Sequence, residues 1–277
     1  MENEGHTDLV RDVAVHPKVA TERRCLVSFC VAMAAFCGIV VAGWLLQSTA
    51  LAGWQRENLH WNFLLHGLMF LVAVSAMRGL GRSAREYGLC LPGWREGMNV
   101  GVFGAVLYLV FVAIGLAMGA FTASKTLIAF PIGTLIYQVI FVAIFEEFFF
   151  RGFLQHEFDR SWPRGGAGCQ GLVDLGWLIT AILFGLGHGM GRFNPFLNAY
   201  GFEAGTFLAT FVFGCVLGFL RVRSVSIWPC VVLHLAANVS TTIFLTPTSK
   251  AGEVLLFMGF FSALPLVAIG CVRTQRN

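Results

Sequence analysis

The stretch YQVIFVAIFEEFFFRGF, residues 137–153, carries two glutamates and one arginine in a run that is otherwise mostly apolar. It closes a hydrophobic block, residues 127–153, that is long enough to cross the roughly 30 Å hydrocarbon core of a bilayer as a helix. An ionised side chain inside hydrocarbon is costly unless another group compensates it. The stretch therefore predicts a membrane helix and, within it, a candidate functional site.

The rest of the chain has the same character. Of its 277 residues, 57% are hydrophobic and only 12% are charged, whereas soluble domains are about 45–50% apolar and about 25% charged. We therefore expect an all-α, polytopic membrane protein, a bundle of about eight transmembrane helices. The predicted spans are residues 25–46, 58–77, 98–120, 127–153, 174–190, 204–222, 225–245 and 253–272.

The basic residues predict the orientation. Fifteen of the 19 lysines and arginines fall on one side of these spans, which places both termini in the cytoplasm by the positive-inside rule. We expect residues 1–24 to be a polar cytoplasmic tail and residues 25–277 to be a single transmembrane catalytic domain, with its motif core at about 127–245. The net charge of +4 and the absence of a Lys/Arg run argue against nucleic acid as a partner.

Glu146, Glu147 and Arg151 are the charged residues of the opening stretch. Glu147 and Arg151 are four residues apart, so on a helix they share a face and can form an ion pair. Glu146 points about 100° away around the helix and has no partner within the stretch. A membrane carboxylate without a local counter-charge is a candidate functional group, whereas the pair alone could be a structural ion pair near the headgroups.

Three further polar residues lie in predicted spans. His188 is in FGLGHG (184–189), and His234 and Asn238 share one helical face in HLAAN (234–238). For each, hydrogen-bonded packing between helices is the structural alternative to function. The other histidines carry less weight, because they lie in the tail, near predicted interfaces or, for His66, on a helix without an acidic residue; they are His6, His16, His60, His66 and His156.

Together these groups suit hydrolysis. Glu146 could act as a general base on a water molecule that His188 helps to hold. His234 and Asn238 could donate to the oxyanion of a peptide carbonyl under attack. No serine or cysteine in these motifs stands where a nucleophile is expected, so water attack is favoured over an acyl-enzyme.

Other chemistries use the same residues. Glu146, His188 and His234 could instead bind zinc, but the HExxH spacing is absent and we predict no cofactor. A non-proteolytic membrane scaffold or immunity protein would use the motifs for packing alone. A proton-coupled transporter would be expected to show inverted-repeat halves, which the sequence lacks.

The three motifs also match a known family. EEFFFR (146–151), FGLGH (184–188) and HLAAN (234–238) reproduce, in order, its EExxxR, FxxxH and HxxxN motifs. The chain resembles the CAAX-protease and bacteriocin-processing family of glutamate-dependent intramembrane endopeptidases, which includes the Ras-converting CAAX endopeptidase. The motif-bearing region is under half of the chain.

The resemblance implies roles for the matching residues. Glu146 matches the catalytic glutamate, His188 the residue that shares its water, and His234 and Asn238 the oxyanion stabilisers, with Glu147 and Arg151 as the supporting pair. It also implies a membrane-associated protein or peptide substrate, lipidated or membrane-anchored, cleaved near its C-terminus at a site reached from the cytoplasm. No residue distinguishes prenylated tails, sorting-signal tails and bacteriocin leaders, and none indicates an oligomeric state. We expect a multi-pass protein of a prokaryotic plasma (inner) membrane.

Overall fold

Helices form most of the chain that the structure describes. The structure is a computed structural model, and it describes residues 17–89, 94–122, 131–161, 175–238 and 246–247. The elements up to residue 161 are α1 (Pro17–Gln47), α2 (Ala50–Asn58), α3 (Phe63–Gly79), α4 (Trp94–Ala117), β1 (Phe121–Thr122), α6 (Pro131–Ile136), the π-helical η1 (Tyr137–Ile144), α7 (Phe145–Glu147), the π-helical η2 (Phe148–Leu154) and α8 (Gln155–Ser161). After these come α9 (Leu175–Gly189), β2 (Phe193–Asn194), the 3-10 turn η3 (Pro195–Leu197), β3 (Ala199–Tyr200), α10 (Ala204–Ser224), α11 (Trp228–Asn238) and β4 (Thr246–Pro247).

The strands form two short antiparallel pairs. β1 pairs with β4, and β2 pairs with β3. Each strand has only two residues. The pairs therefore fasten loops at the ends of helices, and the helices build the fold.

The predicted membrane spans are confirmed in part. Within the described residues, four helical segments are long and apolar enough to cross a bilayer: Arg24–Gln47, Met98–Ala117, Ile132–Ser161 and Ala204–Ser224. α2 and α3 would make a fifth only as a broken span, because they meet at a bend of 113°. α9 has 15 residues, the predicted span 225–245 is described only as far as Asn238, and the predicted span 253–272 lies outside the described residues.

Two predicted boundaries differ from the structure. α1 begins at Pro17, inside the segment expected to be a polar tail, of which residues 1–16 lie outside the described residues. The predicted span 58–77 is interrupted because Asn62 caps a new helix, accepting a hydrogen bond from the Leu65 amide at 3.4 Å. The side of the membrane on which the termini lie stays a prediction.

The opening stretch lies in a continuous helical rod made of α6, η1, α7, η2 and α8. The rod runs to Ser161 rather than ending at residue 153 as predicted, because its polar last turns find buried partners. The amide of Gln155, for example, donates to the Gly218 carbonyl at 3.0 Å. Two of its segments are π-helical, and they flank the single α-helical turn that carries the two glutamates. Such π segments are rare and occur frequently at functional sites.

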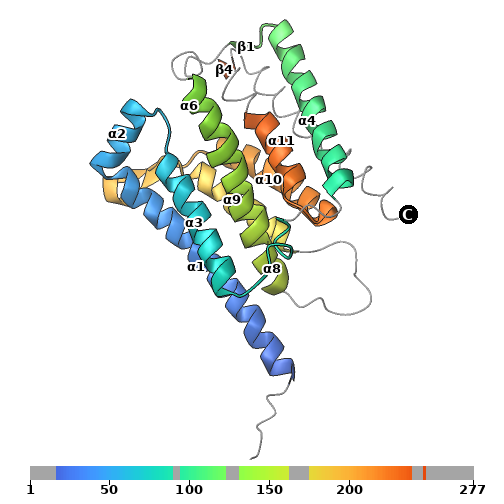
Figure 1. Ribbon diagram of the computed structural model, residues 1–277. Coiled ribbons are helices and arrows are strands. Elements are labelled where there is room, and N and C mark those ends of the chain that lie inside the picture. Colours follow the sequence, from blue (N-terminus) through green and yellow to red (C-terminus); the bar gives the residue numbers. More distant parts are fainter. Residues whose placement is uncertain (1–16, 90–93, 123–130, 162–174, 239–245, 248–277) are drawn as a thin grey trace, which may run out of the picture.

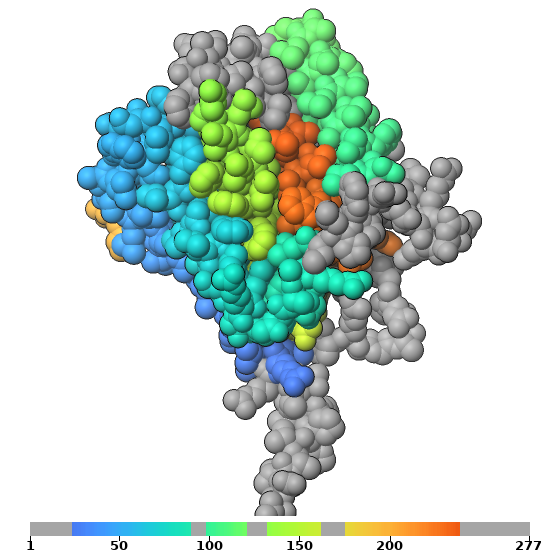
Figure 2. Space-filling view, viewed as in Figure 1, coloured from blue at the N-terminus to red at the C-terminus, as the bar shows by residue number. Residues whose placement is uncertain are grey.

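The rod lies centrally among the other helices. In Figure 1, α3 runs along one side of the rod and α11 along the other, with α4 beyond α11. Figure 2 shows the surface of α11 exposed between the rod and α4. Residues from α3, the rod and α11, which are far apart in the sequence, are therefore neighbours.

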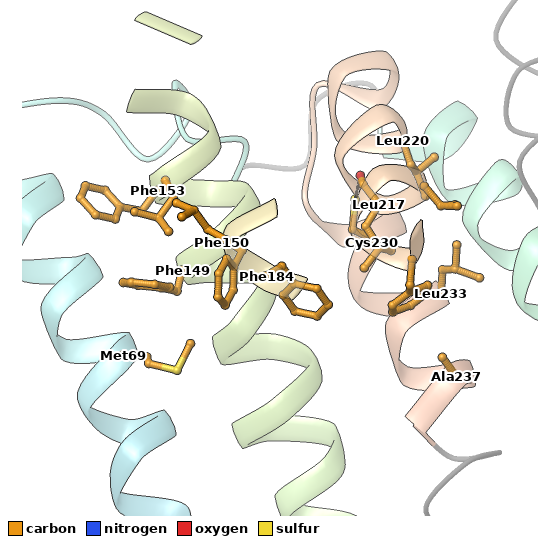
Figure 3. Close-up of a cluster of buried hydrophobic side chains, with 14 of the residues drawn as sticks. Met69, Phe149, Phe150, Phe153, Phe184, Leu217, Leu220, Cys230, Leu233 and Ala237 are labelled. Atoms are coloured by element: carbon orange, nitrogen blue, oxygen red, sulfur yellow. Dashed lines mark hydrogen bonds between the residues drawn. The ribbon is translucent and has the colours of Figure 1, made fainter. Parts of the chain in front are cut away.

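Aromatic and aliphatic side chains fill the space between these helices. Phe149, Phe150 and Phe153 of the rod and Phe184 of α9 lie on one side of the core, and Leu217 and Leu233 lie on the other (Figure 3). Of the three rod residues, Phe150 contacts Phe184, with ring centroids 5.0 Å apart. All of these residues are buried. They hold the rod, α9, α10 and α11 in fixed positions around the glutamates.

Small residues let pairs of helices approach closely. A Cβ added to Gly101 of α4 would lie 2.7 Å from the Pro229 carbonyl oxygen of α11. One added to Gly214 of α10 would lie 3.1 Å from the Cα of Ala181 in α9. Gly119 differs, because its φ of +67° places it in a turn after α4.

The outer surface of the helices is apolar. Large hydrophobic side chains such as Leu71 and Phe103 are more than half exposed. Exposed apolar surface on long hydrophobic helices is what a lipid environment requires. The chain is therefore a multi-pass membrane protein.

Candidate active site

The two glutamates of α7 are buried. Glu146 is 4% exposed and Glu147 is fully buried. They share one turn of the rod but face different partners, because adjacent helical residues point in directions about 100° apart. The Glu146 side chain therefore faces the protein interior and not the lipid.

Glu147 is the centre of a structural network. Its Oε1 accepts a hydrogen bond from Nη1 of Arg151 at 3.1 Å, which confirms the predicted pair. The Arg151 guanidinium also donates to the Gly214 carbonyl at 3.3 Å and lies over the ring of Phe184. The same Oε1 lies 2.7 Å from Nδ1 of His234. Glu147 thus joins the rod to α11 and orients the His234 ring.

Glu146 faces imidazoles. Its Oε1 lies 2.8 Å from Nε2 of His66, in α3. Its Oε2 lies 3.8 Å from Nε2 of His234 and accepts no hydrogen bond within the described residues. The carboxylate also interacts electrostatically with His188. One oxygen is therefore held, while the other points toward the predicted catalytic histidines.

His188 lies near the end of α9, one residue before its last residue, Gly189. Its Nδ1 is 2.9 Å from the Phe184 carbonyl oxygen, so Nδ1 carries the proton and Nε2 is left with a lone pair. The Phe184 ring centroid is 4.5 Å from that of His188 and 6.0 Å from that of His234. The two histidines therefore lie around one aromatic ring.

Asn238 follows His234 by one turn and is the last described residue of α11. Its side-chain Nδ2 is buried and has no hydrogen-bond partner among the described residues. An unpaired buried amide is costly, so this donor is suited to a group that arrives with a ligand.

His66 contacts Glu146, although its sequence context gave it little weight as a site residue. Its acidic partner, Glu146, is 80 positions away in the sequence, so no local spacing reveals the contact. A signal existed nonetheless, because His66 lies in an apolar helix, and an ionisable residue there is itself a candidate functional group. His66 is additionally held by the Asn62 carbonyl and the Tyr137 hydroxyl, each 3.1 Å from Nδ1.

The residues described do not assemble a metal centre. Among them, no group of three His, Cys, Asp or Glu side chains is arranged to hold a metal ion. Whether the protein uses a cofactor stays a prediction.

The fold and the site together define a class: a polytopic helical membrane protein with a buried carboxylate–imidazole site. Comparison with known proteins adds a family resemblance. Residues 128–240 match the family model described as type II CAAX prenyl endopeptidase Rce1-like. The match contains all three motifs and confirms the resemblance that they gave. Among curated proteins, none matches the chain.

Proposed function

We propose that this protein is an intramembrane endopeptidase in which Glu146 activates a water molecule to cleave a peptide bond of a membrane-associated protein. The observation that carries the proposal is Oε2 of Glu146, which is buried, lies 3.8 Å from Nε2 of His234 and accepts no hydrogen bond from the described residues, while Oε1 contacts His66. The family match supports the same activity over residues 128–240.

The first step uses Glu146 as the base. A water at Oε2 donates one proton to Glu146, and its second O–H is accepted by the free Nε2 of His188 or of His234. The water oxygen forms a bond to the peptide carbonyl carbon, whose oxygen becomes negative. When the tetrahedral intermediate collapses, the C–N bond breaks and the leaving amine takes the proton from Glu146.

The oxyanion needs a donor. The amide of Asn238 is a suitable one, because its Nδ2 has no other partner among the described residues. His234 is bonded to Glu147 through Nδ1, so it can donate from Nε2 only in its doubly protonated form. We therefore assign the oxyanion chiefly to Asn238, and the holding of water to the neutral histidines.

For the substrate, we propose a lipidated protein or peptide cleaved near its C-terminus. The family description names prenyl endopeptidases, and a protein surrounded by lipid meets its substrates in the membrane. We place the protein in a prokaryotic plasma membrane, with the site reached from the cytoplasmic side, where the predicted excess of basic residues lies.

The test is cleavage by purified protein reconstituted into vesicles. The probe is an internally quenched peptide with a farnesylated cysteine followed by three residues, and the control probe lacks the farnesyl group. We expect the prenylated probe to be cleaved after the cysteine, and Glu146→Gln to lower kcat/KM by about 10³-fold. Cleavage that persists in Glu146→Gln would contradict the proposed mechanism, and preference for the unprenylated probe would contradict the substrate.

A further inference from the structure

The buried site holds an unequal number of fixed charges. Glu146 and Glu147 contribute two negative charges and Arg151 contributes one positive charge, and all three side chains are nearly or fully buried. The titratable groups that interact with Glu146 are His66 from α3, His188 from α9, His234 from α11 and Tyr137 from the rod. With all three imidazoles neutral the cluster would carry one uncompensated negative charge, which is costly in a buried site.

The partners of the three imidazoles indicate which of them carries the balancing proton. His188 and His234 each have one nitrogen facing an acceptor, the Phe184 carbonyl and Glu147 respectively, so the neutral form satisfies both. His66 differs, because the carboxylate that its Nε2 contacts, Glu146 at 2.8 Å, has no arginine partner among the described residues. Its Nδ1 lies 3.1 Å from both the Asn62 carbonyl and the Tyr137 hydroxyl.

In the neutral form, Nε2–H would donate to Glu146 and Nδ1 would accept from the Tyr137 hydroxyl, so hydrogen bonding permits both the neutral and the imidazolium form. The fixed charges decide between them. Only the imidazolium form supplies a positive charge in contact with Glu146, the second buried carboxylate. We infer that His66 carries the proton that balances Glu146, acting as the counter-ion and positioning residue that keeps this carboxylate ionised and its Oε2 free for water.

This inference rests on the proposed function, because it gives Glu146 the ionised form that a base requires. The histidines then have two different roles. His66 and Tyr137 hold the oxygen of Glu146 that does not react, whereas His188 and His234 face the water. The surroundings suit a fixed position for His66: Tyr137 is buried, and its ring stacks on Trp61 with centroids 4.9 Å apart.

The first test is spectroscopic and needs no substrate. Infrared difference spectra between wild type and Glu146→Gln at neutral pH report whether Glu146 is ionised. We expect an ionised carboxylate in the wild type. In His66→Leu we expect a protonated carboxyl band instead, which disappears in the double variant His66→Leu/Glu146→Gln. An ionised Glu146 in His66→Leu would overturn the inference.

The second test is kinetic and uses the farnesylated probe in vesicles. His66→Leu should lower kcat by about 10²-fold while KM stays within about threefold, because the base and not the binding site is affected. His66→Gln keeps one N–H toward Glu146 and should recover part of kcat, which also guards against a folding failure of the leucine variant. The matched control is His156→Leu, which removes an imidazole of α8 outside the site and should leave kcat within about threefold.

The outcomes distinguish this inference from the proposed function. If Glu146→Gln abolishes cleavage and His66→Leu cleaves at the wild-type rate, the counter-ion role fails and the endopeptidase proposal stands. If Glu146→Gln cleaves normally, the endopeptidase mechanism fails, while the infrared spectra still decide whether His66 balances the charge of Glu146.

Discussion

Two buried glutamates of the same helical rod, Glu157 and Glu146, have different partners. Near its end, Glu157 accepts hydrogen bonds through Oε1 from the guanidinium of Arg82 and, at 2.9 Å, from the hydroxyl of Tyr87. Arg82 also donates to Ser28 of α1 at 2.9 Å. In the middle of the rod, Glu146 faces imidazoles on three other helices.

The partners of the two glutamates differ in whether they exchange protons near neutral pH. A guanidinium keeps its protons at any physiological pH. Burial, with the neighbouring Glu157 carboxylate, raises the pKa of Tyr87, so this phenol also keeps its proton. Glu157 therefore sits among fixed donors and ties the loop after α3 to α1 and α8. Imidazoles gain and lose protons near neutral pH, so the surroundings of Glu146 suit proton transfer.

The largest expected effect is a loss of stability when the arginine that pairs with a buried glutamate is replaced. Arg151 pairs with Glu147 as Arg82 pairs with Glu157, so replacing either arginine by methionine leaves a buried carboxylate without its positively charged partner. We expect each variant to lose about 3–5 kcal/mol of unfolding free energy, measured by thermal and denaturant unfolding in detergent. A matched double variant, Glu147→Gln/Arg151→Met, should be less destabilised than Arg151→Met alone. Wild-type stability in Arg151→Met would show that the pair is not structural.

A substitution of Asn238 tests the proposed active site around Glu146. Asn238→Leu should lower kcat by about 10²–10³-fold, or about 3–4 kcal/mol, with little change in KM, because an oxyanion donor acts in the transition state. Stability should not fall, since the Nδ2 atom has no partner to lose among the described residues. Initial rates on the farnesylated probe measure this effect, and an unchanged kcat would remove Asn238 from the mechanism.

The packing that carries His234 and Asn238 toward the rod gives a smaller effect. In Gly101→Ala the new methyl group would lie 2.7 Å from the Pro229 carbonyl oxygen, so α4 and α11 must separate. We expect a loss of about 1–3 kcal/mol of stability. Gly104→Ala on the same helix is the matched control, because the nearest atom would be 3.5 Å away on the flexible Leu233 side chain. Equal stability of the two variants would contradict the close packing.

The smallest expected effect on activity is that of removing metal ions. Dialysis against a strong chelator should leave the rate on the farnesylated probe unchanged, and metal analysis should give well below one zinc ion per chain. Loss of activity on chelation, restored by zinc alone, would favour the zinc alternative over activation by Glu146.

Much of the site could be predicted because its motifs are local. The Glu147–Arg151 pair follows from a spacing of four, and HLAAN places His234 and Asn238 on one helix. His66 was undervalued because its contact with Glu146 depends on how α3 packs on the rod. The π-helical segments also went unpredicted, because the apolar pattern around Tyr137 is that of any buried helix.

Some membrane spans could also be predicted from the sequence, and others could not. Hydrophobicity located helices correctly at 25–46, 98–120 and 204–222, since length and composition alone decide those segments. It placed one span at 58–77, where the structure has the end of α2, a bend and α3. The cap residue Asn62 marks that break, but a hydrophobicity pattern does not register it.

The most direct measurement compares Glu146→Gln with Glu157→Gln on the farnesylated probe, as the rate per folded molecule in vesicles. Both substitutions remove a buried charge from the same rod. We predict that Glu146→Gln folds and loses about 10³-fold in rate, whereas Glu157→Gln is less stable yet its folded fraction keeps a rate within about threefold of wild type. Equal rates in the two variants would contradict the assignment of Glu146 as the base.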